Sequence, residues 1–590
     1  MGQRGQSMVS RSVWNPSKLE VVAENGAVTA MQPPSAEAGM AMLKAGGNAV
    51  DAAVAMAFCN IVLEPYMATI AGMGYMLVHM AAEGKTYAID FNGRAPRNAH
   101  PDMYKVIGPA PAGGIQLFDV EDGANRDGPL SVTVPGTCAG LCEAHGRFGS
   151  LPLEQVVEPS VALASDGFEA NWHLTLYAAN NPEMFGKDPY IASMWLPDGR
   201  PPRSHPQPGE KVVQRELGDL LRKIGKRGAA AMYEGEIADE IGRYMRDSGG
   251  VLTAQDLHDY EARVSPPLTV PYLGHEVNIV PTPSGAVTNM QVYRILENLG
   301  IANMEQNSVE HLHAFIQAAR HAYADRFRYL GDWEHADVPL AGMLSGEYGR
   351  EVAGLIEKSD RADIGVGSDE EPWAYYLERA VHDPWRHQGG KAGVPVPQAA
   401  MDGNDEDTTH INVVDKDRNA VSTTHTGFFG SGLNPPGTGV YLTGGMAWFI
   451  PMAGYANSLG GWKRPLNNMA PVMVFKEGRP VLCQGAPGAR KIMNRGVQVV
   501  SNVVAFGMSP QEALVQPTVD ASGRETLVDA RIPEHVVQGL RDLGHLVKVV
   551  EEEPGMTGNF SRPSAITIDY DTGLLHAGVD AFRPAIAMGY

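Results

Sequence analysis

The sequence predicts an α+β protein, because helical patterns and strand patterns are both present and concentrate in different parts of the chain. Helices are expected from Pro33 to Lys44 and, in an Ala- and Val-rich run, up to Leu63. The middle of the chain is also helical, with a long amphipathic stretch from Glu310 to Leu330. After residue 407 the sequence becomes rich in glycine and in strand-forming residues.

The first hundred residues alternate between helix and strand patterns. Asn48 is expected to be a helix N-cap, with Asp51 three residues later. The helix that follows is apolar on all sides, so it is expected to be buried. Short strands are expected from Met73 to His79 and from Thr86 to Asp90.

Composition and charge indicate a globular protein and disfavour several partners. The 590 residues are 44% hydrophobic and 19% charged, which is enough for a large core. Lys and Arg number 47 against 68 Asp and Glu, and the net charge of −21 disfavours nucleic acid and anionic membranes. We find no secretory signal, membrane-spanning run or disulfide pattern, so a cytoplasmic enzyme is expected.

Cysteine and histidine spacing does not predict a metal site. Cys138 and Cys142 share one helix face at i and i+4, which favours a position in the core. His311, His313 and His321 lie in the long central helix, but residues two apart point to different faces. We therefore expect solvated or core histidines and no bound metal.

A Pro/Gly-rich and then acidic stretch at about 383–407 predicts a linker without regular structure. The residues directly after it predict a β-hairpin, with strands at 409–414 and 420–426 joined by the loop from Asp415 to Asn419.

The register of this hairpin gives Thr408 a partner. If Val414 pairs with Ala420, Thr408 falls opposite Thr426. Directly opposed threonines on neighbouring strands can hydrogen-bond, so Thr426 is expected to hold the Thr408 hydroxyl. A slip of one residue would break this arrangement.

A threonine at the start of a strand and beside a linker suits a chain that cuts itself there. Cleavage between Asp407 and Thr408 would free an α-amine on the residue that carries the nucleophilic hydroxyl. With a reference pKa of about 7.7–8, that amine can act as a base near neutral pH. The alternative, left open by the hairpin alone, is that Thr408 and Thr409 are ordinary strand residues.

Several motifs closely resemble the γ-glutamyltranspeptidase family of N-terminal-nucleophile hydrolases. They occur in the family's order from about residue 25 to the C-terminus. Each motif alone is weak evidence for the family, whereas the ordered set is specific. The matching segments are Ser35 to Gly39, Gly46 to Ala53, Val134 to Gly136, Leu252 to Leu257, Asp407 to Val421, Lys463 to Leu466 and Gly485 to Gly488.

The resemblance implies a four-layered αββα sandwich made as one precursor. Residues 1–407, including the linker, would form a large subunit and residues 408–590 a small one, both within one αββα domain; a higher oligomer is also possible. It also implies an acyl-enzyme reaction on a small-molecule amide, with no metal or organic cofactor. Thr408 would be the nucleophile, Thr426 would orient it, and the backbone N–H groups of Gly488 and Ala489 would form the oxyanion hole.

The residues that grip the glutamyl group in this family are largely absent. The family arginine for the α-carboxylate aligns with Asn92, although Arg94 is two residues away. The family Ser-Ser pair for the same carboxylate aligns with Asn467 and Asn468, which could still bind a carboxylate or amide edge by hydrogen bonds.

The contacts to the substrate ammonium are altered as well. The polar and acidic residues of the family align here with Gly445 and Trp448. An aromatic side chain in place of a carboxylate favours an apolar or planar acyl group. The expected function is therefore a self-processing amide hydrolase or acyltransferase that acts on a non-glutamyl substrate.

Three alternatives remain open at this stage. The first is a genuine γ-glutamyl hydrolase or transpeptidase that acts on glutathione-like compounds through Arg94 and the two asparagines. The second is a carbon–carbon-cleaving hydrolase of natural-product biosynthesis, as some relatives with altered pockets are. The third is a catalytically silent binding protein on the same scaffold, which would have no need to process itself.

Overall fold

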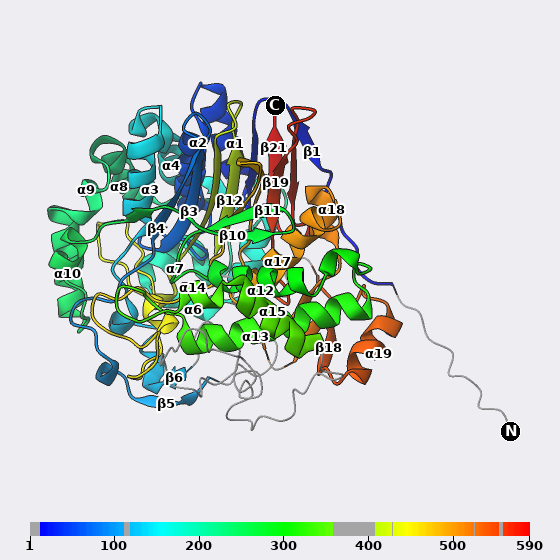
Figure 1. Cartoon of the computed structure of the whole chain (residues 1–590). Helices are drawn as coiled ribbons and strands as arrows, with labels where there is room; N and C mark the ends of the chain where they lie inside the picture. The colour runs from blue at the N-terminus through cyan, green and yellow to red at the C-terminus, as the bar shows by residue number, and fades with distance from the viewer. Residues whose placement is uncertain (1–11, 111–117, 358–407, 428, 524, 554–557) are drawn as a thin grey trace.

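Two seven-stranded sheets packed face to face, with helices over both outer faces, form the four layers of the fold (Figure 1). The computed structural model describes residues 12–110, 118–357, 408–427, 429–523, 525–553 and 558–590. One apolar cluster lies between the sheets, and one larger cluster lies between each sheet and its helices. The predicted αββα sandwich is confirmed.

The first sheet has the order β21-β2-β12-β13-β3-β4-β9, with every neighbouring pair antiparallel. Its strands are β21 (Ile586–Gly589), β2 (Ala27–Ala30), β12 (Thr409–Val414), β13 (Ala420–Thr426), β3 (Met73–Met80), β4 (Lys85–Phe91) and β9 (Arg263–Ser265).

The second sheet has the order β1-β20-β19-β15-β14-β11-β10, also antiparallel throughout. Its strands are β1 (Val21–Ala23), β20 (Leu575–Val579), β19 (Ser564–Ile568), β15 (Arg479–Gly485), β14 (Val472–Lys476), β11 (His275–Ile279) and β10 (Leu268–Tyr272). Both sheets combine strands from either side of residue 408.

The helices divide between the two outer faces according to the apolar cluster that they join. The first sheet's cluster includes α1 (Pro33–Lys44), α2 (Ala49–Leu63), α3 (Thr137–Phe148), α4 (Leu153–Asp166), α5 (Trp172–Asn180), α6 (Pro182–Gly186), α7 (Pro189–Trp195), α8 (Arg215–Arg227), α9 (Ala230–Tyr233), α10 (Glu236–Asp247) and α11 (Ala254–His258). The second sheet's cluster includes α12 (Ala286–Asn298), α13 (Val309–Tyr329), α14 (Leu340–Met343), α15 (Gly346–Glu357), α17 (Lys491–Val504), α18 (Pro510–Val515) and α19 (Glu534–Asp542).

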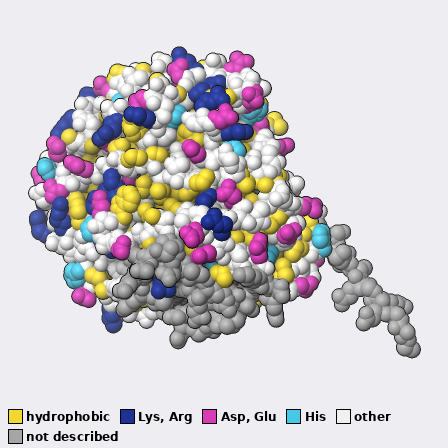
Figure 2. All heavy atoms as spheres, viewed as in Figure 1, with side chains coloured by type: hydrophobic (Ala, Val, Ile, Leu, Met, Phe, Trp, Pro, Cys, Tyr) yellow, Lys and Arg dark blue, Asp and Glu magenta, His cyan; other side chains and the backbone are white. Residues whose placement is uncertain are grey.

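The remaining strands of the described residues are short. They are β5 (Val106–Pro109) with β6 (Phe118–Val120), β7 (Phe168–Glu169) with β8 (Lys211–Val212), and the group β16 (Val519–Asp520), β17 (Thr526–Asp529) and β18 (Val547–Val550). Among the described residues, no helix combines the length and apolar character needed to cross a membrane. The face in Figure 2 carries acidic and basic side chains intermixed.

The helices and strands predicted from the sequence form within a few residues of their expected ends. Asn48 and Asp51 make a reciprocal capping box, and every residue of α2 is buried. The cysteines bear out the core interpretation, because Cys138 is buried and Cys142 is partly buried. In α13, His311 and His321 are buried, and His313 Nδ1 lies 2.8 Å from His545 Nε2.

The β12–β13 hairpin has the predicted register. Val414 pairs with Ala420 and Thr409 pairs with His425, so Thr408 comes next, opposite Thr426. The hairpin lies in the interior of the first sheet, between β2 and β3, which fixes both of its edges. A slip of one residue would turn its buried side chains to the wrong layer.

Two of the contacts between this hairpin and the second sheet are made with β15. Ser422 Oγ donates a hydrogen bond to the carbonyl oxygen of Gln484 (3.2 Å). The ring of His410 packs on Gly485, where an added Cβ would lie 2.2 Å from His410 Cε1. Gly485 is therefore required because of the close approach of the two sheets.

The close approach at Gly485 predicts a large cost for a single added methyl group. Gly485→Ala should lower the free energy of unfolding by about 1–3 kcal/mol, because the buried His410 ring has no room to retreat. Gly146→Ala is the matched control: an added Cβ there meets no atom within 4 Å, and in a helix it should be neutral or stabilising. Equal effects of the two substitutions in urea unfolding would contradict this packing.

Candidate active site

The two predicted catalytic threonines meet at one end of the hairpin. Thr408 Oγ1 donates a hydrogen bond to Thr426 Oγ1 (3.1 Å), and both residues are buried. The next side chain, Thr409, turns to the helix layer and accepts a hydrogen bond from Asn60 Nδ2 of α2 (3.0 Å). Asp407, the residue on the other side of the predicted cut, lies outside the described residues.

The strand register extends this pair into a row across the sheet. Thr426 pairs with Met73 of β3. Gly74 pairs with Phe91, so Asn92 follows beside Met73 at the end of β4. Neighbouring strands lie about 4.7–4.9 Å apart, so Thr408, Thr426, Met73 and Asn92 form a sequence of adjacent positions on the inter-sheet side.

Gly488 and Ala489 form the turn that leads into helix α17. Gly488 has φ +133° and Ala489 has φ +51°. Among the described residues, neither N–H donates a hydrogen bond. Two free N–H groups at a helix N-terminus suit an oxyanion, and the left-handed alanine stores about 1–2 kcal/mol of backbone strain.

The inter-sheet contacts place this turn toward Thr408. Ser422, the cross-strand partner of Asn412, bonds Gln484, and His410 packs on Gly485. Moving toward the C-terminus along β15 therefore corresponds to moving toward the N-terminus along β12. Three residues beyond Gly485, the turn lies toward the Thr408 end of the hairpin.

A buried segment supports the turn from behind. A Cβ on Gly488 would lie 2.5 Å from the Cβ of Ser561, so this position needs glycine for space as well as for conformation. The backbone N–H of Arg562 donates to the carbonyl oxygen of Pro487 (3.0 Å). Arg562 is in turn paired with the buried carboxylate of Glu552.

Asn92 and Asn467, predicted to touch substrate, lie together and engage each other. Asn92 Nδ2 donates to Tyr75 Oη (3.0 Å) and to the Pro465 carbonyl (2.7 Å), and its Oδ1 accepts from Asn467 Nδ2 (3.0 Å). Asn467 Nδ2 also lies 3.3 Å from Tyr75 Oη. Both amide nitrogens are thus committed to protein partners.

Asn468 is held by a buried arginine of α13. Arg326 Nη2 donates to Asn468 Oδ1 and to the Asn467 carbonyl oxygen, both at 2.8 Å. Burial lowers the pKa of Arg326 to about 10, which leaves it charged near neutral pH. Arg326 therefore fixes the turn that carries both asparagines.

Arg94 lies in a separate cluster of ion pairs. Its Nη1 donates to the Trp462 carbonyl (2.7 Å) and its Nη2 lies 3.2 Å from Glu334. Arg263 and Arg464 also contact Glu334, at 3.1 and 2.9 Å. Although burial favours the neutral acid, the guanidinium groups of Arg464, Arg263 and Arg94 lower the pKa of Glu334.

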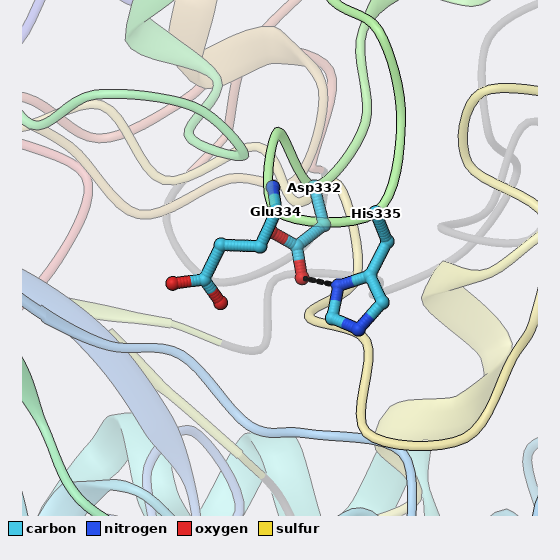
Figure 3. A group of neighbouring side chains, drawn as sticks. All are labelled: Asp332, Glu334 and His335. Carbon is cyan, nitrogen blue, oxygen red and sulfur yellow. Dashed lines mark hydrogen bonds and ion pairs between the residues drawn. The ribbon is translucent and has the colours of Figure 1, made fainter.

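Asp332, Glu334 and His335 offer ligand atoms within 4.8 Å of one another. Figure 3 shows Asp332 beside His335 Nδ1 (3.1 Å), whereas the Glu334 carboxylate points away from that pair. Asp332 also accepts from the Arg464 backbone N–H (2.9 Å). Because arginines occupy Glu334, an ion-pair cluster explains these residues better than a cation site.

Trp448 and Gly445 lie in the short 3₁₀ turn Gly445–Trp448. Trp448 is half-buried and packs against the inter-sheet cluster, which contains Met73 and Tyr75. A Cβ on Gly445 would lie 2.6 Å from Met73 Cε, so the two positions are in direct contact.

Sequence reasoning did not identify Met73, Tyr75 and Arg326 as neighbours of the site. The predicted strand from Met73 to His79 already puts Met73 and Tyr75 on one face by its period of two. Its pairing with β13 could not be deduced from the local pattern, and this pairing is what brings the face to Thr426.

Two buried histidines flank the nucleophile strand pair. Burial lowers the pKa of His410 to about 4. Burial, together with the nearby His410, lowers the pKa of His425 to about 3. Both are neutral near pH 7, so neither supplies a positive charge to the site at that pH.

Comparisons with known proteins identify the family of this chain. Residues 35–590 match the family described as gamma-glutamyltranspeptidase. The chain is 30% identical to a glutathione hydrolase proenzyme of Bacillus subtilis (strain 168), covering 96% of this chain and 92% of that protein. It is 34% identical to an acylase ACY 1 proenzyme of Pseudomonas sp. (strain SE83), covering 88% and 87%.

A solved structure matches the whole fold. The crystal structure of cephalosporin acylase from Bacillus halodurans superimposes with a TM-score of 0.79 at 25% identity, covering 100% of this chain and 99% of that one. The fold and sequence define an amide hydrolase of the N-terminal-nucleophile type. The chain belongs to the γ-glutamyltranspeptidase family.

The buried neutral histidines predict a loss of stability in acid. Their folded-state pKa values lie below the usual 6.5, so their contribution is fully present above about pH 6.5 and is lost as the pH falls toward 4. In urea unfolding, the free energy of unfolding of His425→Gln should fall by a few kcal/mol less than that of the parent as the pH is lowered over this range. Parallel profiles for the two proteins between pH 6.5 and 4 would contradict the assignment.

Proposed function

We propose that this enzyme cuts its own chain before Thr408 and then hydrolyses or transfers a non-glutamyl acyl group through an acyl-Thr408 intermediate. The observation that carries the proposal is the hydrogen bond between the Thr408 and Thr426 hydroxyls at the open end of a fixed hairpin. Two relatives, a glutathione hydrolase proenzyme and an acylase proenzyme, support a precursor.

In the proposed self-cleavage, Thr408 Oγ1 attacks the carbonyl carbon of Asp407. The hydroxyl proton passes to the amide nitrogen as the peptide C–N bond breaks, which gives the α-amine and an ester between Asp407 and Thr408 Oγ1. Water then hydrolyses this ester and restores the hydroxyl. Residues 1–407 and 408–590 would then be separate polypeptides. Because strands of both enter each sheet, we propose that they stay together as a heterodimer.

In the proposed turnover, the freed α-amine takes the proton of Thr408 Oγ1 as the oxygen attacks the substrate carbonyl. The negative charge that develops on the carbonyl oxygen would be stabilised by the N–H groups of Gly488 and Ala489. The proton passes to the leaving amine as the C–N bond breaks. Water or an acceptor amine then takes the acyl group and restores the hydroxyl.

The non-glutamyl specificity is supported by how the pocket residues are used. Asn92 donates its side-chain N–H groups to Tyr75 and to the Pro465 carbonyl, and Asn467 donates its own to Asn92 Oδ1 and Tyr75. Arg94 is paired with Glu334 and stacks on Trp462. Gripping an α-carboxylate would require these bonds to be broken, at the cost of unpaired buried groups.

Intact-mass and N-terminal analysis tests the self-cleavage directly. We expect two polypeptides, one of which begins at Thr408, and a single uncut, inactive chain for Thr408→Ala. Thr426→Val, which removes the positioning hydroxyl but keeps the volume, should slow turnover by about 10²-fold, whereas Thr426→Ser should retain most of it.

Thr409→Ser is the matched control, because Thr409 faces α2 and keeps its hydroxyl in this variant. It should be cut at the same bond as the parent. Active protein that stays in one piece through residues 407–408 would overturn the proposal.

The specificity is tested by comparing γ-glutamyl-p-nitroanilide with p-nitroanilides of uncharged acyl groups. We expect kcat/KM for the γ-glutamyl compound to be lower by at least about 10-fold, because Arg94 is already paired with Glu334 and the amide N–H groups of Asn92 and Asn467 already donate to protein oxygens. The alternative, a genuine γ-glutamyl hydrolase, is favoured by the 30% identical glutathione hydrolase and would show the opposite order.

A further inference from the structure

We propose that Met73 and Thr133 form the subsite for the acyl chain, and that this subsite takes an uncharged chain carrying one hydrogen-bonding atom. The inference rests on the proposed function, because it assumes that Thr408 is the acylated residue. It goes beyond that function by naming the residues that select the acyl group.

Met73 occupies the position next to the nucleophile pair. It is the cross-strand partner of Thr426, in the same row as Thr408 and Asn92. A chain that extends from an acyl carbon on Thr408 along this row therefore meets Met73 before it reaches the Asn92 amide. The first side chain beyond the two threonines is thus a flexible thioether.

The tip of the Met73 side chain lies between two positions, Gly93 and Gly445, where a larger residue would clash with it. An added Cβ on Gly445 would lie 2.6 Å from Met73 Cε, and an added Cβ on Gly93 would lie 3.2 Å from it. Neither glycine has a positive φ, so the backbone alone does not demand glycine at either position. The methionine fills the space that side chains there would need.

Thr133 brings a polar atom to the same place. Its Oγ1 would lie 2.5 Å from a Cβ on Gly445 and 2.9 Å from a Cβ on Gly93. Thr133 is 1% exposed, and among the described residues its hydroxyl has no hydrogen-bond partner. A buried hydroxyl without a partner costs free energy, which a bound ligand atom could recover.

The chemistry of these residues indicates the acyl group. Met73, Thr133, Gly93 and Gly445 are all uncharged, so nothing among them would pair with an ammonium or a carboxylate. A methionine can move aside for an alkyl chain, and a hydroxyl can donate to or accept from a single polar atom. An ether, carbonyl or hydroxyl within a short neutral chain fits this pair.

Two variants test the two halves of the subsite, with p-nitroanilides of butyryl, hexanoyl and octanoyl groups and of 4-methoxybutanoyl, which has the length of hexanoyl. Met73→Ala should raise the octanoyl-to-butyryl ratio of kcat/KM by about 10-fold, because it lengthens the space. Thr133→Val should abolish the preference for 4-methoxybutanoyl over hexanoyl, a change of about 5- to 10-fold.

Each variant has a matched control in the same chain. Met76→Ala removes a buried methionine from the same strand, but Met76 belongs to the sheet–helix cluster, so the ratio should stay at the parental value. Thr282→Val removes a buried hydroxyl that donates to the Gly331 carbonyl (2.8 Å), so it should lower the thermal midpoint. Thr133→Val should not lower it.

The possible outcomes separate this inference from the function on which it rests. If the parent protein cuts itself and cleaves the amides, but Met73→Ala and Thr133→Val keep its acyl preferences, the subsite is wrong and the function stands. If the parent cleaves none of the amides and remains uncut, the function fails. In either case, the thermal midpoints of Thr133→Val and Thr282→Val decide whether the Thr133 hydroxyl is free for a ligand. A lowered midpoint in Thr133→Val would overturn that assignment.

Discussion

The pairing of β12 with β13 is the constraint on which the whole site depends. It sets Thr408 opposite Thr426, and β13 in turn pairs with β3, which begins at Met73 opposite Thr426. One register thus places Thr408, the proposed nucleophile, beside Thr426 and Met73. The same hairpin carries His410 and Ser422, which join it to β15 and so to the turn at Gly488.

The sandwich supplies rigidity where the chemistry requires it. Thr408, the proposed nucleophile, directly precedes the buried strand β12, and the free N–H groups of Gly488 and Ala489 lie where a strand of the other sheet turns into α17. The approach of the two sheets relates these groups, and it requires a glycine, Gly485, against the ring of His410. Ala489 holds a strained backbone conformation at the proposed oxyanion turn, which Arg562 and Ser561 support from behind.

Local patterns and a family resemblance predicted much of the fold and part of the site. The hairpin register, the α2 capping box and the αββα class followed from spacing, caps and ordered motifs, and the structure confirms them. The use of Asn92 and Arg94 could not be predicted, because their partners, Tyr75, Asn467 and Glu334, come from distant segments. An alignment names the residue at a position, but only the packing shows whether its hydrogen bonds are already taken.

The central claim is that Thr408 itself carries the acyl group during turnover. The most direct measurement is an acid quench of the enzyme during turnover of a slow amide substrate, followed by intact mass and peptide mapping. The account predicts a mass increase equal to the acyl group on the polypeptide that begins at Thr408, located on that residue and removed on further incubation. Steady product release with no adduct, or with an adduct on any other residue, would contradict it.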